Sequence, residues 1–83
     1  MLNIKVLGPG CENCKKLAYF TERAVKSLSI EAKIEKVTDY AQIMKYPILS
    51  TPGLVLNEKL VVSGRVPSEA EITTFLTTAL MDE

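Results

Sequence analysis

The amino-acid sequence predicts an α/β fold: one mixed sheet of four strands with helices on both of its faces. Short runs in which apolar and polar residues alternate, typical of strands, are interleaved with longer segments of helical period. The predicted element order is β-α-β-α-β-β-α. The first two strands, joined through a helix, should be parallel, and a later hairpin adds antiparallel strands. A chain of 83 residues is expected to form one domain over residues 1–83.

The first three elements follow from changes in period. Apolar residues alternate with polar ones over residues 2–6, which predicts a strand, and Gly8-Pro9-Gly10 ends it. Apolar residues then recur at helical spacing, so a helix should begin near Cys11 and end near residues 27–29. A second alternating run predicts a strand over residues 30–35.

The middle of the chain predicts a short helix and a hairpin. Asp39, or the threonine before it, can cap the helix, and Pro47 ends it soon afterwards. Two apolar runs, 54–56 and 60–62, are separated by the polar residues 57–59. This arrangement is typical of two strands joined by a turn.

A final helix follows the hairpin. Ser68 and Glu71 have the spacing of a capping box, in which each side chain accepts a hydrogen bond from the other residue's backbone. The apolar residues over 72–80 recur at positions that share one helix face, so this helix should cover the sheet.

Composition excludes several classes of function. Ten basic and ten acidic residues give a formal net charge of zero, unlike the basic footprint of a nucleic-acid binder. No apolar run approaches the roughly 18 residues of a membrane span, and no signal peptide is evident. Two cysteines are too few for a secreted disulfide scaffold, so we expect a cytoplasmic protein whose close cysteine pair is redox-active or metal-binding.

The two cysteines lie where the first strand gives way to the first helix. Cys11, at the cap or first position of the helix, should lie in the positive field of the helix N-terminus, which favours a thiolate. Cys14, one turn further in, is close enough for a disulfide after a small adjustment. Cys11 is therefore expected to attack and Cys14 to resolve. Lys15 and Lys16 add positive potential, which Glu12 opposes.

These features resemble the thioredoxin-like superfamily, in particular its short, glutaredoxin-sized prokaryotic branch of redox-active disulfide proteins. The resemblance covers essentially the whole chain and depends on Cys11-Glu12-Asn13-Cys14 between strand and helix and on Thr51-Pro52 before the hairpin. It implies a cis peptide bond between Thr51 and Pro52, a proline beside the cysteines, and a Thr51 backbone that pairs with substrate. Gly10 and Asn13 flank the sulfurs and are expected to control access to them.

The resemblance implies a thiol–disulfide oxidoreductase that reduces protein disulfides. Protein disulfides would be its substrates, an external thiol reductase or dithiol would restore it, and neither a bound cofactor nor a metal would be needed. We expect a monomer that binds no nucleic acid or membrane. The best-known members have Trp before the first cysteine and Gly-Pro between the two. Here Gly10, Glu12 and Asn13 stand at those places, which leaves the redox potential open.

Two other interpretations remain. Heavy-metal-associated domains, which carry Cu(I) on two thiolates, also place such a cysteine pair between a first strand and a first helix. They end with a strand, however, and usually have Met where this chain has Pro9. The second alternative is a non-catalytic binding module of the same fold, which would tolerate the loss of Cys11. A structural zinc site would need more Cys or His ligands than this chain offers, because it has no histidine.

Overall fold

A computed structural model describes residues 2–48 and 50–81 of the chain. The elements, in chain order, are β1 (Leu2–Leu7), α1 (Glu12–Leu28), β2 (Ala32–Val37), α2 (Tyr40–Ile43), β3 (Gly53–Leu56), β4 (Lys59–Ser63) and α3 (Glu69–Met81). This is the predicted β-α-β-α-β-β-α order.

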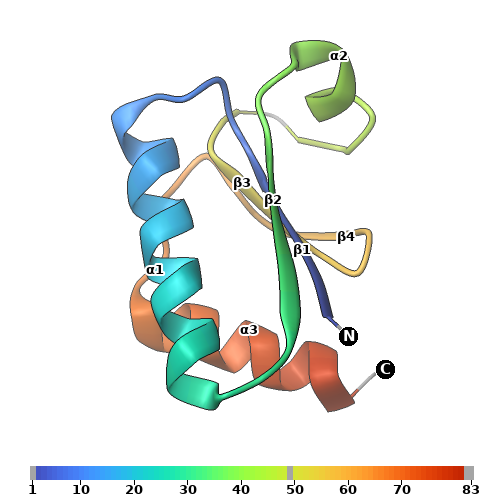
Figure 1. Ribbon diagram of the computed structural model, residues 1–83. Coiled ribbons are helices and arrows are strands. Elements are labelled where there is room, and N and C mark those ends of the chain that lie inside the picture. Colours follow the sequence, from blue (N-terminus) through green and yellow to red (C-terminus); the bar gives the residue numbers. More distant parts are fainter. Residues whose placement is uncertain (1, 49, 82–83) are drawn as a thin grey trace.

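The four strands form one mixed sheet in the order β2-β1-β3-β4. β1 pairs with β2 in parallel and with β3 antiparallel, and β3 pairs antiparallel with β4. Helices α1 and α3 lie together on one face of the sheet, whereas α2 lies near one end of the other face (Figure 1). The predicted mixed sheet with helices on both faces is therefore confirmed.

The second strand begins and ends two residues later than the sequence indicated. β2 begins at Ala32 and extends to Val37, whereas the sequence indicated residues 30–35. The residues before Ala32 make the turn after α1: Ser29 adopts a left-handed conformation with φ of 53°, and its N–H bonds to the last turn of the helix. β2 extends to Val37 because each of its residues pairs with one of β1, and Val37 pairs with Leu7 at the end of β1.

The hairpin turn contains two residues, where the sequence indicated three. Asn57 and Glu58 have φ angles of 49° and 70°, and Lys59 already pairs with Leu56 in the β3–β4 ladder. Two successive left-handed residues match the twist of a hairpin, and asparagine tolerates that conformation. Glu58 is held there by an ion pair of 2.7 Å between its carboxylate and the Lys5 ammonium.

Two apolar clusters lie on the two faces of the sheet. The larger lies under α1 and α3 and includes Leu17 and Ile72, both fully buried. The smaller lies under α2 and includes Leu7 and Val55. Thr21 is the one buried polar side chain among the described residues, and its hydroxyl donates a hydrogen bond of 2.7 Å to the Leu17 carbonyl oxygen. This hydrogen bond within α1 therefore replaces the contact with water that the Thr21 hydroxyl loses on burial.

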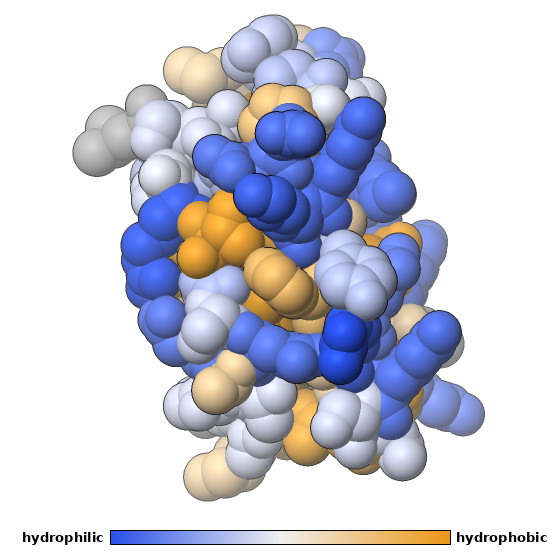
Figure 2. Space-filling model, turned by 90° about the vertical axis from the view of Figure 1, so that its left-hand side faces the viewer, coloured by the Kyte–Doolittle hydropathy of each residue, from blue (hydrophilic) through white to orange (hydrophobic). Residues whose placement is uncertain are grey.

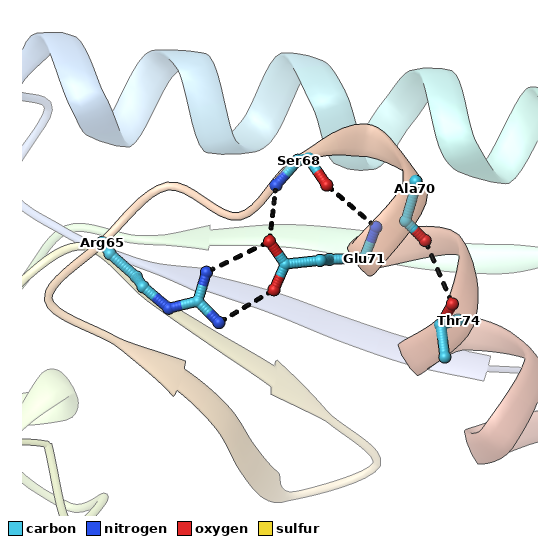
Figure 3. Close-up of polar contacts among 5 residues, drawn as sticks. All are labelled: Arg65, Ser68, Ala70, Glu71 and Thr74. Carbon is cyan, nitrogen blue, oxygen red and sulfur yellow. Dashed lines mark hydrogen bonds and ion pairs between the residues drawn. The ribbon is translucent and has the colours of Figure 1, made fainter.

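The first turn of α3 contains the predicted capping box, as Figure 3 shows. The Glu71 N–H donates to the Ser68 hydroxyl at 3.2 Å, and the Glu71 carboxylate accepts from the Ser68 N–H at 3.4 Å. The same carboxylate accepts two hydrogen bonds from the Arg65 guanidinium, at 3.0 and 3.4 Å. These contacts join the β4–α3 connection to the start of the helix.

The surface over α1 is mainly hydrophilic, with a small hydrophobic area near its middle (Figure 2). Tyr19, on α1, is among the few large apolar side chains that are exposed. No helix in the described part of the chain combines the length and the apolar character that crossing a membrane requires.

Candidate active site at the start of α1

Cys11 is the N-cap residue of α1, one of the two positions that the sequence indicated. Its backbone is extended, and its sulfur accepts a hydrogen bond of 3.2 Å from the Cys14 N–H. Gly10, with φ of +98°, turns the chain from the β1 end into the helix. This conformation is strained for residues with a side chain. The Cys11 side chain is exposed and is joined to Cys14 by a disulfide.

Cys14 lies one helical turn further on and faces the sheet. Only 5% of its surface is exposed, so the two sulfurs of the pair differ strongly in accessibility. The outer and inner places that the sequence assigned to Cys11 and Cys14 are those found in the structure.

Gly8 allows this close packing, and the sequence analysis gave it no role beyond ending the strand. A methyl group built on Gly8 would collide with the Cys14 sulfur and lie 3.1 Å from the Cys14 Cβ. The same methyl group would lie 4.0 Å from the Cα of Pro52. The signal was present in the sequence, since a glycine directly after a buried strand often marks a close approach of another segment.

The Thr51–Pro52 peptide bond is cis, as the resemblance implied. Pro52 is buried at the start of β3, and its carbonyl oxygen accepts a hydrogen bond of 2.8 Å from the Gly64 N–H at the end of β4. A Cβ on Gly8 would meet both Cys14 and Pro52, so the inner sulfur and the cis bond lie at the same end of the molecule. Thr51 is half-buried there.

Gly10 and Asn13 are exposed beside the sulfurs. Asn13 lies on the first turn of α1, between the two cysteines. Nothing lies within 4 Å of the position that a Cβ on Gly10 would take, so the approach to the pair is open on that side.

A separate polar network lies on the sheet face opposite α1. The Lys5 ammonium donates to Glu58 at 2.7 Å and to the Tyr46 hydroxyl at 3.0 Å, and Tyr46 donates to Glu58 at 3.0 Å. The hydrogen bond from Lys5 and then that from Tyr46 lower the pKa of Glu58, whereas the hydrogen bonds that Lys5 donates to Glu58 and then to Tyr46 raise the pKa of Lys5. This network fixes the hairpin turn against β1.

The chain matches a family model described as a thioredoxin domain over residues 2–77. The chain belongs to the thioredoxin family. It is 38% identical over 76 residues to a thioredoxin of Methanothermobacter thermautotrophicus, an alignment that covers 92% of this chain and 99% of that protein. It is 36% identical over 72 residues to a thioredoxin of Methanocaldococcus jannaschii, covering 87% of this chain and 83% of that protein.

Family and fold together decide between the classes left open by the sequence. This thioredoxin-family chain is a thiol–disulfide oxidoreductase whose redox pair is Cys11–Cys14. The heavy-metal-associated alternative requires a chain that ends with a strand, whereas here α3 follows the hairpin. The Cu(I)-carrier interpretation is therefore not supported.

Proposed function

We propose that the chain reduces disulfide bonds of other proteins, with Cys11 as the attacking thiolate and Cys14 as the resolving thiol. The observation that carries this assignment is the difference in exposure: Cys11 is exposed, and Cys14 is 5% exposed. A disulfide on another protein can approach only a sulfur at the surface, whereas the inner sulfur needs to reach only its neighbour.

The surroundings of Cys11 favour its charged form. The Cys14 N–H that donates to its sulfur at 3.2 Å would stabilise a thiolate more than a thiol once the pair is reduced. Helix α1, 17 residues long, adds the positive end of its dipole at the same place. Lys15 and Lys16 supplement this field, and Glu12 works against it.

The proposed cycle has two exchange steps. The Cys11 thiolate attacks one sulfur of the substrate disulfide, whose partner sulfur leaves with the bonding electron pair and takes up a proton. Cys14 then loses its proton and attacks the Cys11 sulfur, and the second substrate sulfur leaves as a thiolate. The substrate gains two electrons, and the Cys11–Cys14 disulfide remains. An external dithiol or thiol reductase restores the dithiol, so the cycle needs no bound cofactor.

The substrate chain would lie across the residues that surround the pair. Thr51, directly before the buried Pro52, can offer its backbone to an extended peptide. Gly10 is exposed and leaves space beside Cys11, and Asn13, on the first turn of α1, is exposed as well. We propose these four residues as the substrate-binding surface.

Trapping the intermediate tests the assignment of roles. In Cys14→Ser, a disulfide substrate such as insulin should remain attached to Cys11 as a stable mixed disulfide, which mass spectrometry of peptides locates. In Cys11→Ser, dithiothreitol-dependent reduction of insulin should be lost. Attachment through residue 14 in the unaltered protein would reverse the roles. Full activity of Cys11→Ser would instead refute the proposed mechanism.

The direction of the reaction is tested by the potential of the pair. We expect reduction, because thiols in the cytoplasm, where we place the protein, are kept reduced. Equilibration of Cys11–Cys14 against glutathione should give a potential near that of other reducing thioredoxins, about −270 mV. A value near that of the oxidant DsbA, about −120 mV, would indicate that the chain forms disulfides.

A further inference from the structure

A groove of about 530 Å³ lies between α3 and the β3–β4 hairpin. Helix α3 contributes Phe75 and Ala79 to its lining, both half-buried, and the hairpin contributes the buried Leu56 and the half-buried Val61. Concave sites of about 300–1,000 Å³ with mainly apolar walls and a few polar groups are typical of sites for small ligands. The groove has the size and the apolar lining of such a site.

The groove lies at the end of the sheet away from the redox pair. Leu56 pairs with Ile4 near the start of β1, whereas the redox pair follows the other end of that strand. Figure 1 shows the hairpin turn and the last turns of α3 on the side of the molecule away from the start of α1. A strand rises about 3.3 Å per residue, so roughly 16 Å separate Asn3 from Gly8 along β1. A ligand in the groove would therefore not touch the sulfurs.

A β-bulge in β4 directs an additional apolar side chain to the groove. Leu60 and Val62 each pair with a residue of β3, and Val61 between them is the extra residue of the bulge. Successive side chains of a regular strand point to opposite faces, but Val61 and Val62 both pack against the cluster under α1 and α3. Bulges re-aim side chains in this way and are frequent beside functional sites. The irregularity therefore adds apolar surface to the groove.

The polar end of the groove, at the hairpin turn, offers a positive charge and a hydrogen-bond donor. Among the described residues that line the groove, Lys59 alone is charged. The Asn57 Oδ1 accepts a hydrogen bond of 3.0 Å from the Asn3 N–H, so the amide NH₂ of Asn57 is left as a donor. On α3 the Thr74 hydroxyl donates to the Ala70 carbonyl oxygen at 3.1 Å, within the helix (Figure 3). The charge and the donor at the turn complement an anion.

We propose that this groove binds a small amphipathic carboxylate, with its apolar body against Val61 and Phe75 and its carboxylate at Lys59 and Asn57. Burial of the apolar body supplies most of the affinity, and the charge of Lys59 selects an anion over a cation. The occupant is a free carboxylate in solution, such as a medium-chain fatty acid anion. This binding site is additional to the redox function and does not depend on it.

The edge strand β4 disfavours a second copy of the chain as the occupant. β4 lies at one edge of the sheet, where another chain could add a strand. The bulge at Val61 and the charge of Lys59 are both features that oppose such pairing. In a two-fold contact centred on the groove, the two Lys59 side chains would also share one interface with like charge.

Titration of the oxidised protein with decanoate tests the proposal. Amide chemical shifts in NMR spectra should change saturably for Val61, Phe75 and Ala79, with a Kd of roughly 0.1–1 mM for a ligand of this size. Decylammonium has the same alkyl chain and the opposite charge, so it should bind several-fold more weakly. Cys11→Ser should bind decanoate with unchanged affinity, because the groove is remote from the redox pair.

Variants separate the contribution of charge from that of the apolar wall. In Lys59→Gln the affinity for decanoate should fall about two- to fivefold, the effect of an exposed ion pair, and the preference over decylammonium should narrow. Lys33→Gln removes the same charge from β2, at the opposite edge of the sheet, and should leave the affinity unchanged. Val61→Ala should weaken both ligands about two- to fourfold, because it removes apolar contact without altering charge.

Absence of saturable shifts in the millimolar range would overturn the inference. So would equal binding of decylammonium, undiminished affinity in Lys59→Gln, or an equal loss in Lys33→Gln. Shifts at the groove that depend on protein concentration without ligand, together with a dimer in sedimentation, would assign the groove to a second copy instead. Loss of binding in Cys11→Ser would place the ligand at the redox pair. Failure of insulin reduction in the unaltered protein would refute the proposed function alone, since decanoate binding is measured independently of it.

Discussion

Gly8 offers a direct test of how closely the redox pair is packed on the sheet. In Gly8→Ala the new methyl group would collide with the Cys14 sulfur and press on the Cys14 Cβ at 3.1 Å. Relieving such an overlap in a packed interior typically costs about 1–3 kcal/mol. For a domain of this size, about 2 kcal/mol lowers the melting temperature by roughly 8–16 °C. Thermal and urea unfolding of the oxidised protein measure the loss.

A double-mutant cycle with Cys14→Ala isolates the contact with the sulfur. Removal of the sulfur should leave only the milder overlap with the Cβ, so Gly8→Ala should cost less in the Cys14→Ala background. Residues in direct contact commonly show coupling of about 0.5–3 kcal/mol, and we expect about 1 kcal/mol here. If Gly8→Ala destabilised both backgrounds equally, the sulfur would not be what Gly8 accommodates, and the reasoning would be refuted.

Three further predictions concern α3, each checked by urea unfolding. Ser68→Ala should cost about 1 kcal/mol, because it removes the hydroxyl that accepts from the Glu71 N–H. Ile72→Ala should cost about 2–5 kcal/mol, since Ile72 is fully buried; a cost below that of Ser68→Ala would contradict its place in the core. The Arg65 guanidinium, and then the Ser68 backbone N–H, lower the pKa of Glu71. The contribution of the Glu71 carboxylate to the free energy of unfolding is therefore complete above its unfolded pKa and is lost as pH falls through its folded pKa. Glu71→Gln should therefore be less stable at neutral pH, and its stability should fall less steeply as the pH is lowered.

The sequence predicted most of what depends on local pattern. The capping box at Ser68 needs residues only three positions apart, and the N-cap place of Cys11 follows from a strand break and a helical period. Both were confirmed. The cis bond before Pro52 was predicted from the family resemblance, since composition and spacing alone favour a trans bond.

Features that depend on distant contacts were missed. Glu58 takes a left-handed conformation in a two-residue turn, where it pairs with Lys5, 53 positions away in the chain. The role of Gly8, which leaves room for Cys14, depends on the Cys14 side chain packing against the end of β1. No local pattern carries these relations.

The strand that leads into the redox pair, β1, is one of the two central strands of the sheet: it is paired along its whole length with β2, and β3 flanks it on the other side. Edges of a sheet open most readily in native-state fluctuations, whereas central strands exchange their amide hydrogens last. Transient fraying of the edge strands β2 or β4 therefore leaves β1, the strand that leads to Cys11 and Cys14, in place. The redox pair is therefore attached to the part of the molecule that opens only when the whole domain unfolds.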